Sequence, residues 1–251
     1  MDTRVHAVTV AAPRSASDLT VRVFADGADL DGIRALAADA GIAGFTTNPT
    51  LMRKAGISDY ERFAHDALAL VGERPISFEV FSDDHADMER QALKIAGWGD
   101  NVYVKIPVTN TQGVASEDLL RRLVAVGVKV NVTGLMTLEQ VEKVADAVAG
   151  DVPSNISVFA GRVADTGVDP VPLMTSALAI MAEAAPSAEL IWASPREVLN
   201  IVQADQVGCH IITVTHDLLK KLSLLGHDHT RFSLETVRMF HDDASAAGFT
   251  L

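Results

Sequence analysis

The sequence NVYVKIPVT at residues 101–109 combines a run of apolar residues with one lysine. Four of its first six residues are β-branched or aromatic, and Pro107 and the polar residues beyond it end the run, so it predicts a buried strand. Lys105 lies near the end of that strand. Taken alone, such a lysine is most often a rim residue whose ammonium reaches water. The chemical alternative is a desolvated amine, with a lowered pKa, that forms a Schiff base with a carbonyl.

Outward from this strand, extended and helical patterns alternate along the chain. Besides the strand that carries Lys105, predicted strands cover residues 20–25, 44–46, 76–80, 128–132, 156–159, 190–193 and 209–214. Predicted helices cover residues 29–40, 58–71, 83–97, 116–126, 137–149 and 170–184, then a stretch opened by Pro195, and 216–222. Ser58 is the expected cap of the second helix. No linker rich in proline, glycine and serine interrupts the pattern.

Eight such alternations predict an α/β protein with a single (β/α)8 TIM barrel. Residues 1–18 have weak periodicity and are expected to form an N-terminal arm or partly disordered leader, and residues 19–251 the barrel domain. Residues 233–246 add a C-terminal helix, expected to pack over the barrel or against a neighbouring subunit of a homo-oligomer.

Composition narrows the possible partners. The chain has 251 residues, 48% of them hydrophobic, and a net charge of −12 from 33 acidic and 21 basic side chains. That balance argues against a nucleic-acid or anionic-membrane surface, which needs a basic patch. The single cysteine, Cys209, excludes an intramolecular disulfide and fits a reducing cytoplasm. No run approaches the roughly 18 apolar residues of a membrane span, and His227-Asp228-His229 is interpreted as a solvated turn rather than a metal site.

Catalytic groups of such barrels project from the C-terminal ends of the strands, and here seven adjacent strand ends are polar. These ends carry Asp26, Asn48, Glu79, Lys105, Asn131, Thr133, Ser157, Arg162, Ser194 and Arg196. Each has a structural explanation when taken singly: Asp26 and Ser194 as helix caps, Asn48 as a turn residue before Pro49, Glu79 as the partner of an arginine. Together they predict one site at one rim.

Five motifs resemble those of the transaldolase family, in order and at compatible spacing. They are GFTTNPT at 44–50, VKIPVT at 104–109, NVT at 131–133, ISVFAGR at 156–162 and ASPR at 193–196. The resemblance runs from residue 26 to about residue 222. It implies a metal-free, cofactor-independent class I aldolase barrel that acts on sugar phosphates in the cytoplasm, in the pentose phosphate pathway. The family's Schiff-base lysine matches Lys105.

The resemblance also implies roles for the other polar residues. Lys105 would attack C2 of a ketose phosphate, and Asp26 would serve as the acid and base for the C4 hydroxyl. Glu79 and Thr133 resemble the pair that holds the water of imine formation. The remaining family positions concern substrate binding. Hydroxyl groups would be held by Asn48, Asn131 and Ser157, and the phosphate by Arg162, Ser194 and Arg196.

Three alternatives remain. The first is the related fructose-6-phosphate aldolases, which cleave the sugar rather than transfer a part of it. These aldolases typically carry glutamine and tyrosine where this chain has Glu79 and Phe159, so the two residues favour transfer. The length of the chain, however, is closer to that of the aldolases. The second alternative is a different anionic sugar as the substrate. Pro195 departs from the family pattern and removes an N–H donor from the predicted phosphate site. A catalytically silent scaffold is the third, disfavoured by the retention of lysine, carboxylates and arginines together.

Overall fold

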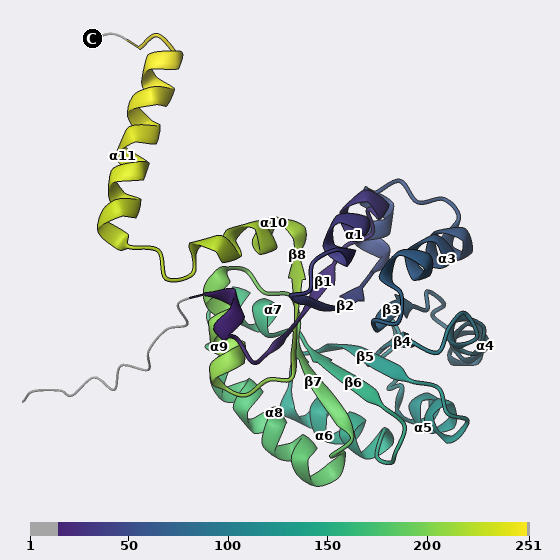
Figure 1. The fold of residues 1–251 in the computed structure, drawn as a ribbon. Coiled ribbons are helices and arrows are strands. Elements are labelled where there is room, and N and C mark those ends of the chain that lie inside the picture. The colour runs from purple at the N-terminus through teal and green to yellow at the C-terminus, as the bar shows by residue number, and fades with distance from the viewer. Residues whose placement is uncertain (1–14, 250–251) are drawn as a thin grey trace, which may run out of the picture.

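The computed structural model describes residues 15–249 and has a closed barrel of eight parallel strands, each hydrogen-bonded to its neighbours in chain order (Figure 1). The strands are β1 (Arg22–Asp26), β2 (Ile42–Thr46), β3 (Ile76–Glu79), β4 (Val102–Pro107), β5 (Val130–Leu135), β6 (Ser154–Val158), β7 (Ala188–Trp192) and β8 (Ile211–Thr215). The predicted fold class is therefore confirmed. The predicted arm falls mostly outside the described residues, and its end forms the 3-10 turn η1 (Ala16–Asp18).

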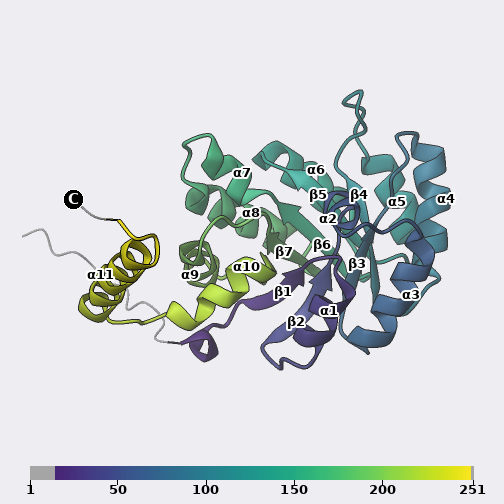
Figure 2. The ribbon, with the colours of Figure 1, turned by 90° about the horizontal axis from the view of Figure 1, so that it is seen from above.

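Helices surround the barrel, as the views from the side and from above show (Figures 1 and 2). They are α1 (Leu30–Ala37), α2 (Pro49–Lys54), α3 (Tyr60–Val71), α4 (His85–Ala96), α5 (Glu117–Ala125), α6 (Leu138–Ala147), α7 (Ala160–Asp165), α8 (Pro170–Ala184), α9 (Val198–Gln206), α10 (His216–Leu219) with the 3-10 turn η2 (Lys220–Leu224), and α11 (His229–Ala246). None of the helices within residues 15–249 is long and apolar enough to cross a bilayer.

Two short helices, α2 and α7, were not predicted from the sequence. Each has six residues, which is too few to show a helical period. Helix α2 begins at Pro49 because proline suits the first helical position, and the side chain of Asn48 caps it by accepting from the Leu51 amide at 2.9 Å. Helix α7 follows β6 almost directly and has no side-chain cap. Both helices follow the C-terminal ends of strands, α2 after β2 and α7 after β6.

At three helix starts, side-chain hydrogen bonds explain why the boundary differs from the predicted one. Asp59, rather than Ser58, caps α3 and accepts from the Arg62 amide at 3.0 Å. Pro195 does not open α9, which begins at Val198, because the Asn200 side chain accepts from the amides of residues 196 and 197 and keeps that segment in a loop. Helix α11 begins at His229, four residues earlier than expected, where Asp228 caps it. In each case a side-chain hydrogen bond decided the boundary.

The core lies inside the barrel and between barrel and helices. Val104 and Ile106 of β4 are fully buried. Lys105 pairs in register with Glu79 of β3 and Asn131 of β5, so these three side chains start from one level of the barrel. Cys209 is a buried core residue, and burial raises the pKa of its thiol to about 12.

Helix α11 stands away from the barrel in both views (Figures 1 and 2), and it has no buried residue. Phe232, Val237 and Phe240 on this helix are exposed, Phe240 by 61%. The expectation that this helix packs over the barrel was therefore wrong. Packing against a neighbouring subunit stays a prediction.

The close approach of β2 to β1 gives a test of the barrel packing. A Cβ at Gly44 would lie 2.6 Å from Cζ of the buried Phe24 ring. We expect Gly44→Ala to lower the free energy of unfolding by about 1–3 kcal/mol, measured by urea denaturation. Gly97→Ala is the control, because its nearest new contact is an ordinary 3.4 Å. Equal stability of the two variants would contradict this packing.

Candidate active site

A cavity of about 650 Å³ opens at the C-terminal ends of the strands. Its walls include every predicted site residue except Asn131: Asp26, Asn48, Glu79, Lys105, Thr133, Ser157, Phe159, Arg162, Ser194 and Arg196. These predicted residues thus share one rim, at the C-terminal ends of the strands, where catalytic groups of such barrels project. The roles assigned to them remain predictions.

Lys105 lies at the cavity floor and is only 8% exposed. Its Nζ donates a hydrogen bond to the backbone carbonyl of Thr47 at 2.8 Å, and β4 carries it between Glu79 and Asn131. The interpretation of Lys105 as a solvated rim lysine is therefore wrong. A buried amine that faces a polar cavity is placed to meet a ligand carbonyl.

Glu79 ends β3 beside Lys105 and is half-buried. Burial raises the pKa of its carboxyl group, the positive charge of Lys105 opposes that rise, and the negative charge of Asp26 adds to it. Tyr60 of α3 donates from its hydroxyl to the Glu79 carbonyl oxygen at 2.8 Å, and burial raises the pKa of that phenol. Within residues 15–249, no arginine forms an ion pair with Glu79, so this part of the chain does not supply the arginine partner considered for it.

Asp26 ends β1 and accepts a 2.7 Å hydrogen bond from the Thr46 hydroxyl of β2. The helix that follows is capped by Asp29, which accepts from the Asp31 and Gly32 amides, so Asp26 is not a helix cap. A half-buried carboxylate at the cavity wall, held by one hydroxyl, keeps other lone pairs for a ligand.

A chain of three side chains supports the cavity from below. Asn131 is fully buried, donates to the Ser77 hydroxyl at 3.0 Å, and accepts from the Ser157 hydroxyl at 2.7 Å. It therefore lies beneath the cavity and orients Ser157, which reaches the wall. Asn48 uses its oxygen to cap α2, which is a structural role just before Pro49. Its amide nitrogen makes no hydrogen bond to residues 15–249, and its predicted role in substrate binding stays a prediction.

The cationic side of the cavity comes from the segments after β6 and β7. The Arg162 guanidinium lies over the Phe159 ring, 5.3 Å from its centroid. The cap of α9 is Glu197, so Ser194 is not a helix cap. Ser194 is the one non-glycine residue of the described chain with a positive φ, 64°. A Cβ at Gly161 would lie 1.6 Å from the Ser194 carbonyl oxygen, so only glycine lets these two segments approach.

Sequence reasoning missed several wall residues and one partner. The missed wall residues with polar side chains are Thr46, Thr50, Lys54 and Thr213. Thr46 and Thr50 stand inside a motif that was noted, and Thr213 follows from the alternation of β8, so a signal existed for these three. Asp165, the ion-pair partner of Arg196, was also missed, because it belongs to the unpredicted α7.

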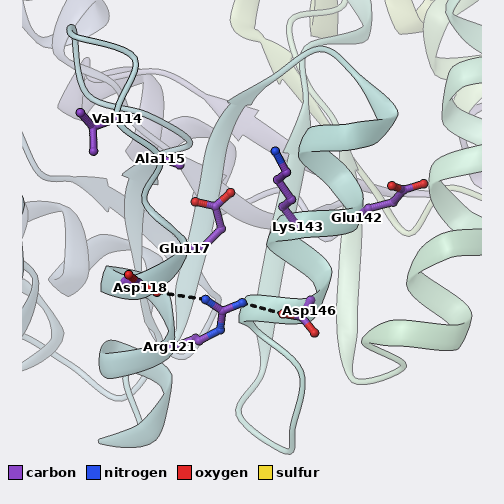
Figure 3. Close-up of a pocket in the computed structure, with 8 residues that line it drawn as sticks. All are labelled: Val114, Ala115, Glu117, Asp118, Arg121, Glu142, Lys143 and Asp146. Atoms are coloured by element: carbon purple, nitrogen blue, oxygen red, sulfur yellow. Dashed lines mark hydrogen bonds and ion pairs between the residues drawn. The ribbon is translucent and has the colours of Figure 1, made fainter.

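A second hollow, of about 570 Å³, lies on the outer surface between α5 and α6 (Figure 3). Its side chains come from the two helices and the loop before α5, and Arg121 lies between Asp118 at 3.1 Å and Asp146 at 2.6 Å. These are ion pairs that join neighbouring helices at the surface. In the described part of the chain, no group of His, Cys, Asp and Glu side chains is arranged to hold a metal ion.

Comparison with known proteins agrees with this geometry. Residues 23–251 match the model of the family described as "Transaldolase/Fructose-6-phosphate aldolase". The chain belongs to this family. A "Probable transaldolase" of Dehalococcoides mccartyi is 35% identical over 202 residues, 80% of this chain and 90% of that one. Another, of a Thermoanaerobacter species, is 32% identical over 231 residues, 92% and 100% of the two chains.

A third similar protein, the "Probable transaldolase" of Streptococcus equi subsp. zooepidemicus, is 34% identical over 81% of this chain and 90% of its own. These likenesses extend over most of the barrel. Membership of the family confirms the resemblance drawn from the five motifs, and it indicates an enzyme of the transaldolase or aldolase type.

The raised pKa of Glu79 predicts a pH-dependent stability difference. A carboxyl group whose pKa is raised on folding stabilises the protein below its unfolded pKa, and this contribution is lost as the pH rises through the folded value. Glutamine does not titrate. We therefore expect Glu79→Gln to be more stable relative to wild type at pH 7 than at pH 4, in urea denaturation at both values. A variant that loses relative stability as the pH rises would contradict the burial of this charge.

Proposed function

We propose that this protein is a transaldolase, which transfers a dihydroxyacetone unit from a ketose phosphate to an aldose phosphate through a Schiff base on Lys105. One observation carries the proposal: the buried Lys105 amine faces a cavity that also holds two carboxylates and two arginines. This is the combination that imine formation, proton transfer and anion binding need. Membership of the family supports it.

The reaction begins when the neutral Lys105 nitrogen adds to the C2 carbonyl carbon of the ketose phosphate. The carbinolamine loses its hydroxyl group as water and becomes a protonated imine. Glu79, whose burial favours its protonated form, and Thr133 are the groups we assign to that water. A carboxyl group with a raised pKa holds its proton more readily, so it can supply that proton and take it back.

The C3–C4 bond then breaks, and its electron pair moves into the imine to give an enamine. Asp26 accepts the proton of the C4 hydroxyl as C4 becomes the carbonyl of the departing aldehyde. In the second half, the enamine carbon attacks the acceptor aldehyde, and Asp26 returns the proton to the new hydroxyl. Hydrolysis of the imine restores the amine.

Retention of the three-carbon unit separates transfer from cleavage. We assign this retention to the Ser157 hydroxyl, held by the buried Asn131, and to the amide nitrogen of Asn48, which makes no hydrogen bond to residues 15–249. The phosphate is assigned to Arg162 and Arg196, because guanidinium groups match phosphate geometry. The single cysteine is compatible with the reducing cytoplasm that we propose as the setting.

Fructose-6-phosphate aldolase activity is the second candidate, because the matched family description includes it. Phe159 at the cavity wall favours transfer, since it offers no hydroxyl to position a water molecule. A different anionic ketose is also compatible with the loop that Pro195 stiffens.

Borohydride reduction tests the Schiff base. We expect fructose 6-phosphate plus borohydride to leave a stable adduct on the peptide that contains Lys105, located by mass spectrometry. Lys105→Arg should abolish the adduct and lower the transfer rate by at least about a thousandfold, because guanidinium is not nucleophilic. Lys54→Arg, at the same cavity wall, is the matched control and should label normally. An adduct on another lysine would overturn the mechanism.

The choice between transfer and cleavage is tested at Phe159. We expect Phe159→Tyr to raise aldol cleavage of fructose 6-phosphate relative to transfer, on the order of a few-fold, because the phenol can help to orient water. The ratio is measured in a coupled assay of both products. Phe159→Leu, which removes the ring without adding a hydroxyl, is the control. An unchanged ratio in the tyrosine variant counts against this use of the residue.

A further inference from the structure

We propose that Asp165 is a positioning residue of the anion site, which holds one edge of the Arg196 guanidinium so that the other edge is presented to a phosphate. The inference rests on the phosphate subsite of the proposed function. Asp165 lies outside the five motifs and does not stand at the end of a strand, because it ends the short helix α7. It does not line the cavity itself.

The contact between the two side chains occupies a defined edge of the arginine. Nε of Arg196 donates to Oδ1 of Asp165 at 3.0 Å and to Oδ2 at 3.1 Å, and Nη2 donates to Oδ2. This side edge is therefore used. The end edge, formed by Nη1 and the second hydrogen of Nη2, makes no other hydrogen bond to residues 15–249. A guanidinium can bind a second oxyanion with that end edge.

Both backbones behind this ion pair are fixed. Helix α7 is tied to the end of β7 by the Gly161 amide, which donates to the Ala193 carbonyl at 3.3 Å. The Arg196 amide donates to the buried Asn200 side chain at 2.7 Å. The ion pair thus joins the segments after β6 and β7, the two that supply the predicted phosphate contacts. An arginine held in this way has already lost rotamer freedom before phosphate arrives.

The charges around the pair also favour positioning. The hydrogen bonds from Arg196 hold the pKa of Asp165 below its usual range, and the charges of Arg196 and Arg162 act in the same direction. The carboxylate is therefore ionised at neutral pH. The side chains of Arg196 and Asp165 are 46% and 51% exposed, and an ion pair in that setting contributes little to stability. The two arginines still outnumber the one carboxylate, so the subsite keeps a net positive charge.

The test is Asp165→Asn, which keeps the size of the side chain and removes its charge. We expect KM for fructose 6-phosphate to rise about threefold to tenfold with kcat nearly unchanged, as loss of a pre-ordered side chain implies. The kinetics of an unphosphorylated ketose should not change. Binding of inorganic phosphate, measured by calorimetry without turnover, should weaken by a similar factor. In an Arg196→Ala background, Asp165→Asn should have no further effect.

Asp146→Asn is the matched control, because it removes a carboxylate from the exposed ion pair with Arg121 in the hollow between α5 and α6 (Figure 3). It should leave both KM values unchanged. Tighter phosphate binding by Asp165→Asn would show that the carboxylate competes with the ligand and would overturn the proposal. Equal losses for phosphorylated and unphosphorylated ketoses, or no change, would also overturn it. Because phosphate binding needs no Schiff base, this result is independent of the borohydride experiment.

Discussion

The parallel register of β3, β4 and β5 is the constraint on which the site depends. It places Lys105 between Glu79 and Asn131 at one level of the barrel, with Pro107 and Thr133 paired two residues further on. Strand pairing therefore brings the amine, one carboxyl group and the supporting amide together without any loop. Closure of the sheet then brings Asp26 of β1 to the same cavity. A site on paired strands is held more rigidly than one on loops.

The two carboxyl groups of the cavity, those of Glu79 and Asp26, have different electrostatic surroundings. Glu79 is half-buried beside Asp26, and burial moves its pKa upward while Lys105 opposes the shift. Asp26 instead accepts a hydrogen bond from the Thr46 hydroxyl group. Two carboxyl groups in one cavity thus have different surroundings, and different surroundings allow different proton-transfer roles.

The cationic side of the cavity is positioned in a different way. Its residues lie on the segments after β6 and β7, where strand pairing gives no help. Packing replaces it: the Ser194 carbonyl fits only against a glycine at 161, Arg162 lies over Phe159, and Arg196 is tied to Asp165. The strained φ of Ser194 is part of that fit. In barrels of this type, loops beyond the strands can vary while the barrel floor stays the same.

The sequence by itself determined the barrel, the strand that carries Lys105 and the group of polar strand ends. These features can be predicted because strands and helices each have their own period of apolar residues, which is visible within a short stretch of sequence. Motif residues from Asp26 to Arg196 could be assigned to one rim for the same reason. Only the tertiary structure decided that Lys105 is buried, that Asn131 lies beneath the cavity, and that Asp165 faces Arg196. It also decided that α11 stands apart from the barrel. These outcomes depend on contacts between residues distant in the chain and on helices too short to show a period, and no local pattern encodes either.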